Sequence, residues 1–149
     1  MFPSHIIFRY GNVYGPRQKP IGENQVVARA IHHFIKGTDF KIVGDGNQKR
    51  DFVYVDDVAF ANCEAVENNL TGTYNLCTGR SASVRHVLRS IEEIYGVVGY
   101  KWDHTKQNDP RGSVYLSNAK IRADFGISFK RLFDGLEATI KDFDTTRKQ

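Results

Sequence analysis

The sequence has few cysteines and no cluster of metal-ligating side chains. Its 149 residues contain two cysteines, Cys63 and Cys77, which are neither closely spaced nor accompanied by a group of histidines. Isolated cysteines of this kind are typical of small buried side chains in a reducing compartment. His32 and His33 are adjacent, so on a helix their rings would diverge and could not easily share a metal ion. We therefore expect no metal site.

Long apolar segments and basic runs are also absent. No apolar stretch approaches membrane-spanning length, and the first residues lack the charged region and apolar core of a secretion signal. These features predict a cytoplasmic protein with no membrane partner. The formal net charge of +4 leans basic, with a pI near 9.1. Because no basic stripe or aromatic platform accompanies that charge, it favours anionic ligands and not nucleic acid.

Local patterns predict alternating strands and helices in one α/β domain. Short apolar runs bounded by turn residues are typical of buried strands, and apolar stripes at helical spacing that end at glycine are typical of amphipathic helices. The predicted strands span residues 6–8, 41–43, 52–55 and 73–76, with a further extended segment at 114–116. The predicted helices span residues 24–36, 56–68, 84–95, 118–125 and 130–143. No internal repeat or low-complexity linker marks a domain boundary.

The most informative stretch covers residues 44–59. Gly44 and Gly46 permit positive φ, and the acidic and amide side chains beside them can bond neighbouring backbone groups, which predicts a tight turn. Arg50 follows this turn on a short constrained segment, where a guanidinium can present a planar, permanently charged fork to a phosphate or diphosphate. The alternative is a surface ion pair between Arg50 and Asp51, which would contribute almost nothing to stability.

A second group of polar residues follows the predicted strand at 6–8. Two glycines and a proline within residues 11–16 make the chain leave that strand abruptly. In open α/β sheets, ligands collect where loops leave the carboxyl ends of strands, which places Tyr10, Asn12 and Arg17 at a ligand-binding edge. A turn whose glycines serve geometry alone is the open alternative.

These stretches resemble a known family. The run GDGNQKRDFVYVDDVA at 44–59 resembles the C-terminal signature of the NAD-dependent epimerase/dehydratase family, the extended short-chain dehydrogenases that act on sugar nucleotides. Residues 9–18 are similar to the RYxNVYGPRQ element of that family, and matches at 74–79 and 109–112 follow in the family's order. The resemblance implies an α/β fold: the last strands of a Rossmann-type parallel sheet plus a small α/β substrate-binding domain.

The resemblance also implies roles for individual residues. Tyr10 is expected to contact the nicotinamide of an NAD cofactor, and Arg50 is expected to bind the diphosphate of a nucleoside diphosphate sugar. The residues expected to bind the sugar nucleotide are Asn12, Gln25, Val26, Val43, Arg50 and Arg111. For the glutamine and the two valines, packing in the core or exposure at the surface is an equally open alternative.

Two positions depart from the family pattern. The family often shows Arg-Pro-Gly-Asp where this chain has Pro110, Arg111, Gly112 and Ser113, so the arginine is displaced by one position. In an extended segment such a displacement would point the side chain the other way. Gly11 stands where relatives commonly carry a phenylalanine beside the sugar, which reshapes the pocket and leaves the sugar unpredicted.

The motifs of catalysis and of dinucleotide binding are missing. No tyrosine is followed four residues later by lysine, and no G-x-G-x-x-G fingerprint follows an early strand. Residues 1–149 therefore resemble the C-terminal substrate-binding portion of a family member, with the NAD-binding portion expected before Met1. The expected function is sugar-nucleotide binding in an NAD-dependent epimerase or dehydratase, inactive alone. A free-standing module that binds a nucleoside diphosphate sugar without turnover is the alternative.

The predicted strands also bear on partners. Residues 6–8 and 73–76 are expected to be inner strands of a larger sheet, and exposed strand edges invite pairing with another chain. We therefore expect an N-terminal partner chain or self-association, and an isolated polypeptide that is unstable, partly disordered or associated.

Overall fold

The computed structural model describes residues 5–21, 25–42, 44–96 and 112–146, and within them strands and helices alternate. The mixed α/β fold predicted from the sequence is confirmed. The strands are β1 (Ile6–Tyr10), β2 (Asn12–Tyr14), β3 (Lys49–Tyr54), β4 (Gly72–Leu76) and β5 (Ser81–Ser83). The helices are α1 (Val26–Lys36), α2 (Val55–Glu67), α3 (Val84–Tyr95), α4 (Ala119–Phe125) and α5 (Leu132–Thr146).

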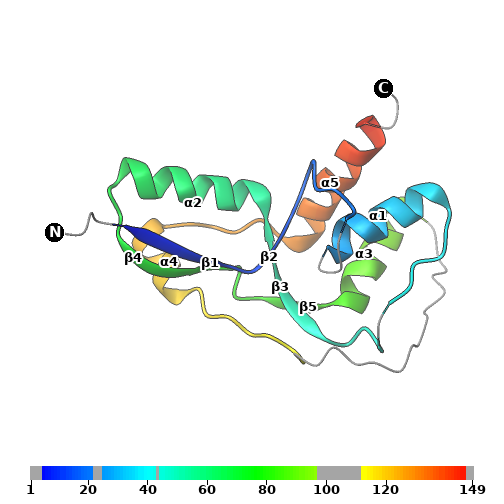
Figure 1. Cartoon of the computed structure of the whole chain (residues 1–149), viewed down its shortest axis with the longest axis horizontal. Coiled ribbons are helices and arrows are strands. Elements are labelled where there is room, and N and C mark those ends of the chain that lie inside the picture. Colours follow the sequence, from blue (N-terminus) through cyan, green and yellow to red (C-terminus); the bar gives the residue numbers. More distant parts are fainter. Residues whose placement is uncertain (1–4, 22–24, 43, 97–111, 147–149) are drawn as a thin grey trace.

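The strands form two small sheets that are joined at a sharp corner. β1 pairs in parallel with β4, with Phe8 opposite Tyr74. β3 is the middle strand of the second sheet, parallel to β2 on one side and antiparallel to β5 on the other. Figure 1 shows α2 along the β1–β4 pair, whereas α1, α3 and α5 gather at the opposite end of the molecule.

Two hydrophobic clusters meet at β3. Phe52 and Tyr54 belong to a cluster that includes residues of α1, α3 and α5, and Val53 belongs to a second cluster with residues of β4, α2 and α4. Because alternate residues of a strand point to opposite faces, these three consecutive residues supply both clusters. β3 therefore couples the β1–β4 sheet to the helices at the other end.

Local signals at the helix ends explain several boundaries. The hydroxyl of Ser83 accepts a hydrogen bond from the amide of His86, as expected of an N-terminal cap. α1 and α3 end at Gly37 and Gly96, which both adopt the left-handed conformation that glycine tolerates without penalty. The carboxylates of residues 56–57 lie in the first turn of α2, where the helix dipole favours negative charge.

Three details differ from the sequence-based expectations. Lys41 and Ile42 lie outside any strand, and Val43 lies outside the described residues, so the strand expected at 41–43 is not formed by the first two. Arg50 lies inside β3 and not ahead of it. Cys63 is exposed, whereas Cys77 is buried as expected.

The strands β2 and β5 were not predicted, because three-residue segments carry no periodic signal and form by pairing with β3.

The described ranges contain no group of three or more metal-ligating side chains. Among the helices that the structure describes, none is both long enough and apolar enough to cross a lipid bilayer.

Candidate ligand-binding site at the junction of the two sheets

The corner between β1 and β2 packs directly on β3. The amide of Gly11 donates to the carbonyl of Leu76 at 2.9 Å, so the corner is tied to the end of β4. A Cβ atom built on Gly11 would lie 2.8 Å from the carbonyl oxygen of Asp51, which is closer than real side chains approach. A larger residue could enter this corner only if β3 moved, so glycine permits the close approach of the two strands.

This corner presents two of the predicted site residues. Tyr10 ends β1 and its side chain is 49% exposed, and Asn12 begins β2 and is half-buried. Asn12 lies opposite Phe52 in the parallel register, two residues from Arg50 along β3. The carboxyl end of β1 and the middle of β3 are thus brought together by a single turn of chain.

Arg50 is a buried and fixed arginine. Its side chain is 9% exposed, and Nη1 donates to the carbonyl of Lys49 at 2.8 Å and to the carbonyl of Gly112. The alternative of a surface pair with Asp51 is wrong, because Asp51 is 2% exposed and its Oδ1 accepts from both the amide and the hydroxyl of Thr78. The guanidinium is held in one direction by carbonyl oxygens, which limits the entropy that ligand binding would cost.

The turn before Arg50 is formed as predicted and is anchored to α3. Gly44 and Gly46 have φ of 75° and 70°, and the carboxylate of Asp45 accepts from both the backbone and the side-chain amide of Asn47. These hydrogen bonds lower the pKa of Asp45 from its ordinary value. The amide of Arg85 donates to the carbonyl of Gly46, so the turn is tied to the start of α3.

The remaining predicted residues are placed elsewhere or lie outside the described ranges. Gln25 precedes α1, and its side-chain oxygen accepts from the amide of Ile21 at 3.2 Å. Val26 begins α1 and packs against the cluster that contains Phe52, which fits the alternative of core packing. Val43 and Arg111 are outside the described residues. The structure thus places Tyr10 and Asn12 on either side of the Gly11 corner and Arg50 on the neighbouring strand β3. It links Gln25 and Val26 to local packing.

Asp51 is a structural residue of this junction that the sequence did not reveal. Its Oδ1 joins β3 to Thr78, two residues after the end of β4, and its Oδ2 is buried without a hydrogen-bond partner in the part of the chain that the structure describes. The pKa of the neighbouring Cys77 thiol is raised to about 11 by its burial and by the negative charge of Asp51. The sequence signal was the adjacency to Arg50, which suggested a surface pair instead.

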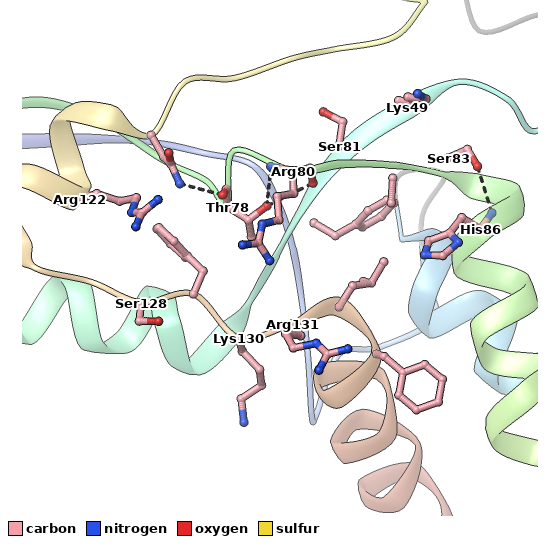
Figure 2. Close-up of a pocket in the computed structure, with 16 residues that line it drawn as sticks. Lys49, Thr78, Arg80, Ser81, Ser83, His86, Arg122, Ser128, Lys130 and Arg131 are labelled. Carbon is pink, nitrogen blue, oxygen red and sulfur yellow. Dashed lines mark hydrogen bonds between the residues drawn. The ribbon is translucent and has the colours of Figure 1, made fainter.

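A separate cleft of about 550 Å³ lies beside β5 and the start of α5. Figure 2 shows basic side chains that reach it from several segments of the chain. The basic residues that line it are Lys49, Arg80, His86, Arg122, Lys130 and Arg131. No acidic side chain of the described residues lines this cleft. Sequence spacing could not have revealed the group, because its members are scattered over about eighty positions.

Comparison with known proteins points to one family. Residues 4–77 match the model of the family described as "NAD dependent epimerase/dehydratase family". A crystal structure of UDP-glucose 4-epimerase from Thermotoga maritima with UDP-glucose is 36% identical with a TM-score of 0.85, and the match covers 97% of this chain and 47% of that one. The UDP-glucose 4-epimerase of Thermus thermophilus in complex with NAD is 33% identical with a TM-score of 0.81, covering 95% and 47%.

A curated relative extends the same likeness. A provisionally named UDP-glucose 4-epimerase of Methanocaldococcus jannaschii is 36% identical over 130 residues, which are 87% of this chain and 41% of the relative. The chain spans about half the length of the relatives it matches. The predicted fold, part of an extended short-chain dehydrogenase, is confirmed by these structures.

Proposed function

Since this chain belongs to the NAD-dependent epimerase/dehydratase family, we propose that residues 1–149 are the sugar-nucleotide-binding portion of a nucleotide-sugar epimerase or dehydratase. The reaction of such an enzyme is hydride transfer on the sugar ring of a nucleoside diphosphate sugar. In this proposal the chain binds and orients the substrate and is inactive without an NAD-binding half. The protein acts in the cytoplasm and has no nucleic-acid partner.

Arg50 is the observation that carries the proposal. An arginine is permanently charged and is seldom buried, yet this one is 9% exposed and is oriented by two carbonyl oxygens. A fork fixed in this way matches the paired oxygens of a diphosphate. Asn12 lies on β2 opposite Phe52, the residue two positions after Arg50 on β3. Its side-chain amide can both donate and accept hydrogen bonds, which suits the diphosphate or a sugar hydroxyl.

Tyr10 is the residue of this chain that we assign to NAD. Its ring is 49% exposed at the carboxyl end of a parallel strand, the position at which open α/β sheets hold their ligands. The half-exposed ring therefore fits contact with a nicotinamide. NAD, when bound, supplies the acceptor and donor of the hydride. The Tyr-x-x-x-Lys pair that handles the proton is absent from this sequence, so we expect binding without turnover from this chain alone.

The test is titration calorimetry with UDP-glucose on the wild type and on Arg50→Gln. We expect saturable binding by the wild type and a loss of about tenfold or more in Arg50→Gln, since a charged hydrogen-bonding group contributes roughly 1.5–3 kcal/mol. Arg89→Gln, an exposed charge change of the same kind on α3, is the control and should bind like the wild type. Equal affinity of Arg50→Gln and the wild type would contradict the proposal, provided that their melting curves coincide.

The second candidate is a module that binds the sugar nucleotide and never takes part in turnover. Both candidates account for a sequence without the catalytic pair and the dinucleotide fingerprint. The two candidates separate when the chain is mixed with NAD, UDP-glucose and a separately produced N-terminal half of the Thermotoga maritima relative. Appearance of the epimeric sugar nucleotide supports the enzyme portion, whereas binding without product at every mixing ratio supports the module.

A further inference from the structure

The basic cleft is lined by positive side chains, three of which are arginine side chains without an ion pair or hydrogen bond to the part of the chain that the structure describes. Arg80, Arg122 and Arg131 come from the β4–β5 turn, from α4 and from the segment before α5. None of these three side chains makes an ion pair or hydrogen bond with a described residue. Figure 2 shows their guanidinium groups around the hollow. Like charges gathered in one cleft repel each other and raise the local concentration of anions, so the arrangement favours an anionic occupant.

Lys130 differs from the three arginines. Its ammonium nitrogen lies 4.6 Å from the centre of the Tyr54 ring, and Figure 2 shows the side chain pointing away from the hollow. Its backbone amide donates to Asp57, so the segment that carries Arg131 is tied to the start of α2. Lys130 therefore helps to fix the segment that carries Arg131, and we expect the anion to bind the three arginines and not the Lys130 ammonium group.

The backbone beneath two of the arginines is held by a network of hydrogen bonds. Thr78, itself bound by Asp51, accepts from the amide of Arg80 at 3.1 Å. The side chain of Asn118 donates to the carbonyl of Thr78 at 2.7 Å and so ties the start of α4, which carries Arg122, to the same turn. Two guanidinium-bearing segments are thus fixed to each other before any ligand binds, which lowers the ordering cost of binding.

The N-terminus of α3 lies near the cleft but has no free backbone amides in its first turn to bind an anion. The amides of Val84 and Arg85 donate to the carbonyls of Gln48 and Gly46, and the amide of His86 donates to the hydroxyl of Ser83. The first donors of α3 are therefore already engaged and cannot bind an anion. Recognition in this cleft rests on side chains.

The inner wall of the cleft is apolar and partly aromatic. Phe52 and Ala82 of the second sheet and Leu132 of α5 line it, with the half-buried rings of Phe129 and Phe133 beside them. A volume of about 550 Å³ lies within the usual range of small-molecule sites. Phosphates suit the guanidinium rim, and a flat base suits the aromatic wall.

We propose that this cleft binds a nucleoside diphosphate or triphosphate at a site separate from the sugar-nucleotide site. None of Asn12, Gln25, Val26 and Arg50 lines the cleft. The polyphosphate lies against Arg80, Arg122 and Arg131, and the base lies on the apolar wall. This second site does not depend on the function proposed for the first.

The experiment uses ADP, inorganic pyrophosphate and adenosine as probes in titration calorimetry. We expect saturable ADP binding that weakens as salt rises, weaker pyrophosphate binding and little adenosine binding, because both the phosphates and the base contribute. Arg80→Gln/Arg122→Gln should weaken ADP binding about tenfold or more, as expected when charged hydrogen bonds are lost. Both residues are exposed, so the variant should fold, and coincident melting curves verify this.

The controls separate this site from the first one. Arg85 is unsuitable as a control because its side chain donates a hydrogen bond to the turn at 44–47. Arg89 and Lys141 are exposed and lie outside the cleft, so Arg89→Gln and the double variant Arg89→Gln/Lys141→Gln are the charge-matched controls. Both variants should bind ADP like the wild type. Arg50→Gln should also retain ADP binding. Equal loss in the charge-matched controls, loss in Arg50→Gln with full binding in the cleft variant, or absence of saturable ADP binding would each overturn the proposal.

Discussion

Asp51 holds the end of β4 to the middle of β3, because its Oδ1 accepts hydrogen bonds from the amide and the hydroxyl of Thr78 at 2.8 and 2.9 Å across 27 positions of sequence. The same residue's carbonyl oxygen lies against Gly11 at the corner between the two sheets. One side chain and its backbone thus connect the β1–β2 corner, the strand that carries Arg50 and the turn that carries Arg80. Both proposed ligand sites depend on this connection.

Asp51→Ala should destabilise the protein by about 3 kcal/mol, because it leaves the buried amide and hydroxyl of Thr78 without an acceptor. Urea unfolding followed by circular dichroism measures the change. Glu67→Ala, an exposed carboxylate at the end of α2, is the control and should shift the midpoint little. If both variants unfolded at the same urea concentration, the Asp51–Thr78 hydrogen bonds would not contribute to the free energy of unfolding.

Gly135→Ala should destabilise the protein by about 2 kcal/mol, although alanine is the better helix former. A Cβ atom at this position in α5 would fall within 3.0 Å of the rings of Tyr14 and Tyr54 in the core, and still closer to the Tyr14 hydroxyl. Removing that hydroxyl in Tyr14→Phe should recover part of the loss in the double variant. Thermal unfolding of the wild type, both single variants and the double variant completes a double-mutant cycle and gives the interaction energy between the two substitutions. Strict additivity would contradict the predicted clash.

The two cysteines should differ in reactivity. Cys77 is fully buried and its thiol pKa is raised to about 11, so at pH 8 almost no thiolate forms there. Cys63 is exposed on α2. Iodoacetamide at pH 8, followed by peptide mass spectrometry, should label Cys63 within minutes and Cys77 only after denaturation. Rapid labelling of Cys77 in the native protein would show that the end of β4 is open.

β1 should mediate self-association of the isolated chain. In the described structure β1 pairs on one side with β4 and ends its sheet on the other, and Ile7 is 47% exposed. We expect sedimentation velocity to show association that increases with concentration, and Ile7→Lys to reduce it, because a charge on an edge strand opposes pairing. Val66→Lys is the control, since Val66 is 79% exposed but lies on α2 and not on a strand. Equal effects of the two variants would exclude β1 as the contact.

Much of the local structure could be predicted. The turn at 44–47 follows from two glycines and from side chains that bond their own backbone neighbours, so its formation needs no distant contact. The ends of α1 and α3 follow from Gly37 and Gly96 for the same reason. The placement of Arg50 inside β3 could not be predicted, because β3 extends back to Lys49 by pairing with β5.

The sequence by itself determined the helices, the turn that precedes Arg50 and the family, because each depends on residues close together in the chain. The tertiary structure alone decided that Asp51 is buried against Thr78 and that Arg80, Arg122 and Arg131 surround one cleft. Asp51 and Thr78, and likewise Arg80 and Arg122, are separated by tens of positions, and no local preference carries information about which distant segment will pack beside them. The close approach of Gly11 to β3 and the pairing of β3 with β2 and β5 decide which segments become neighbours, and both exist only once the sheets have formed.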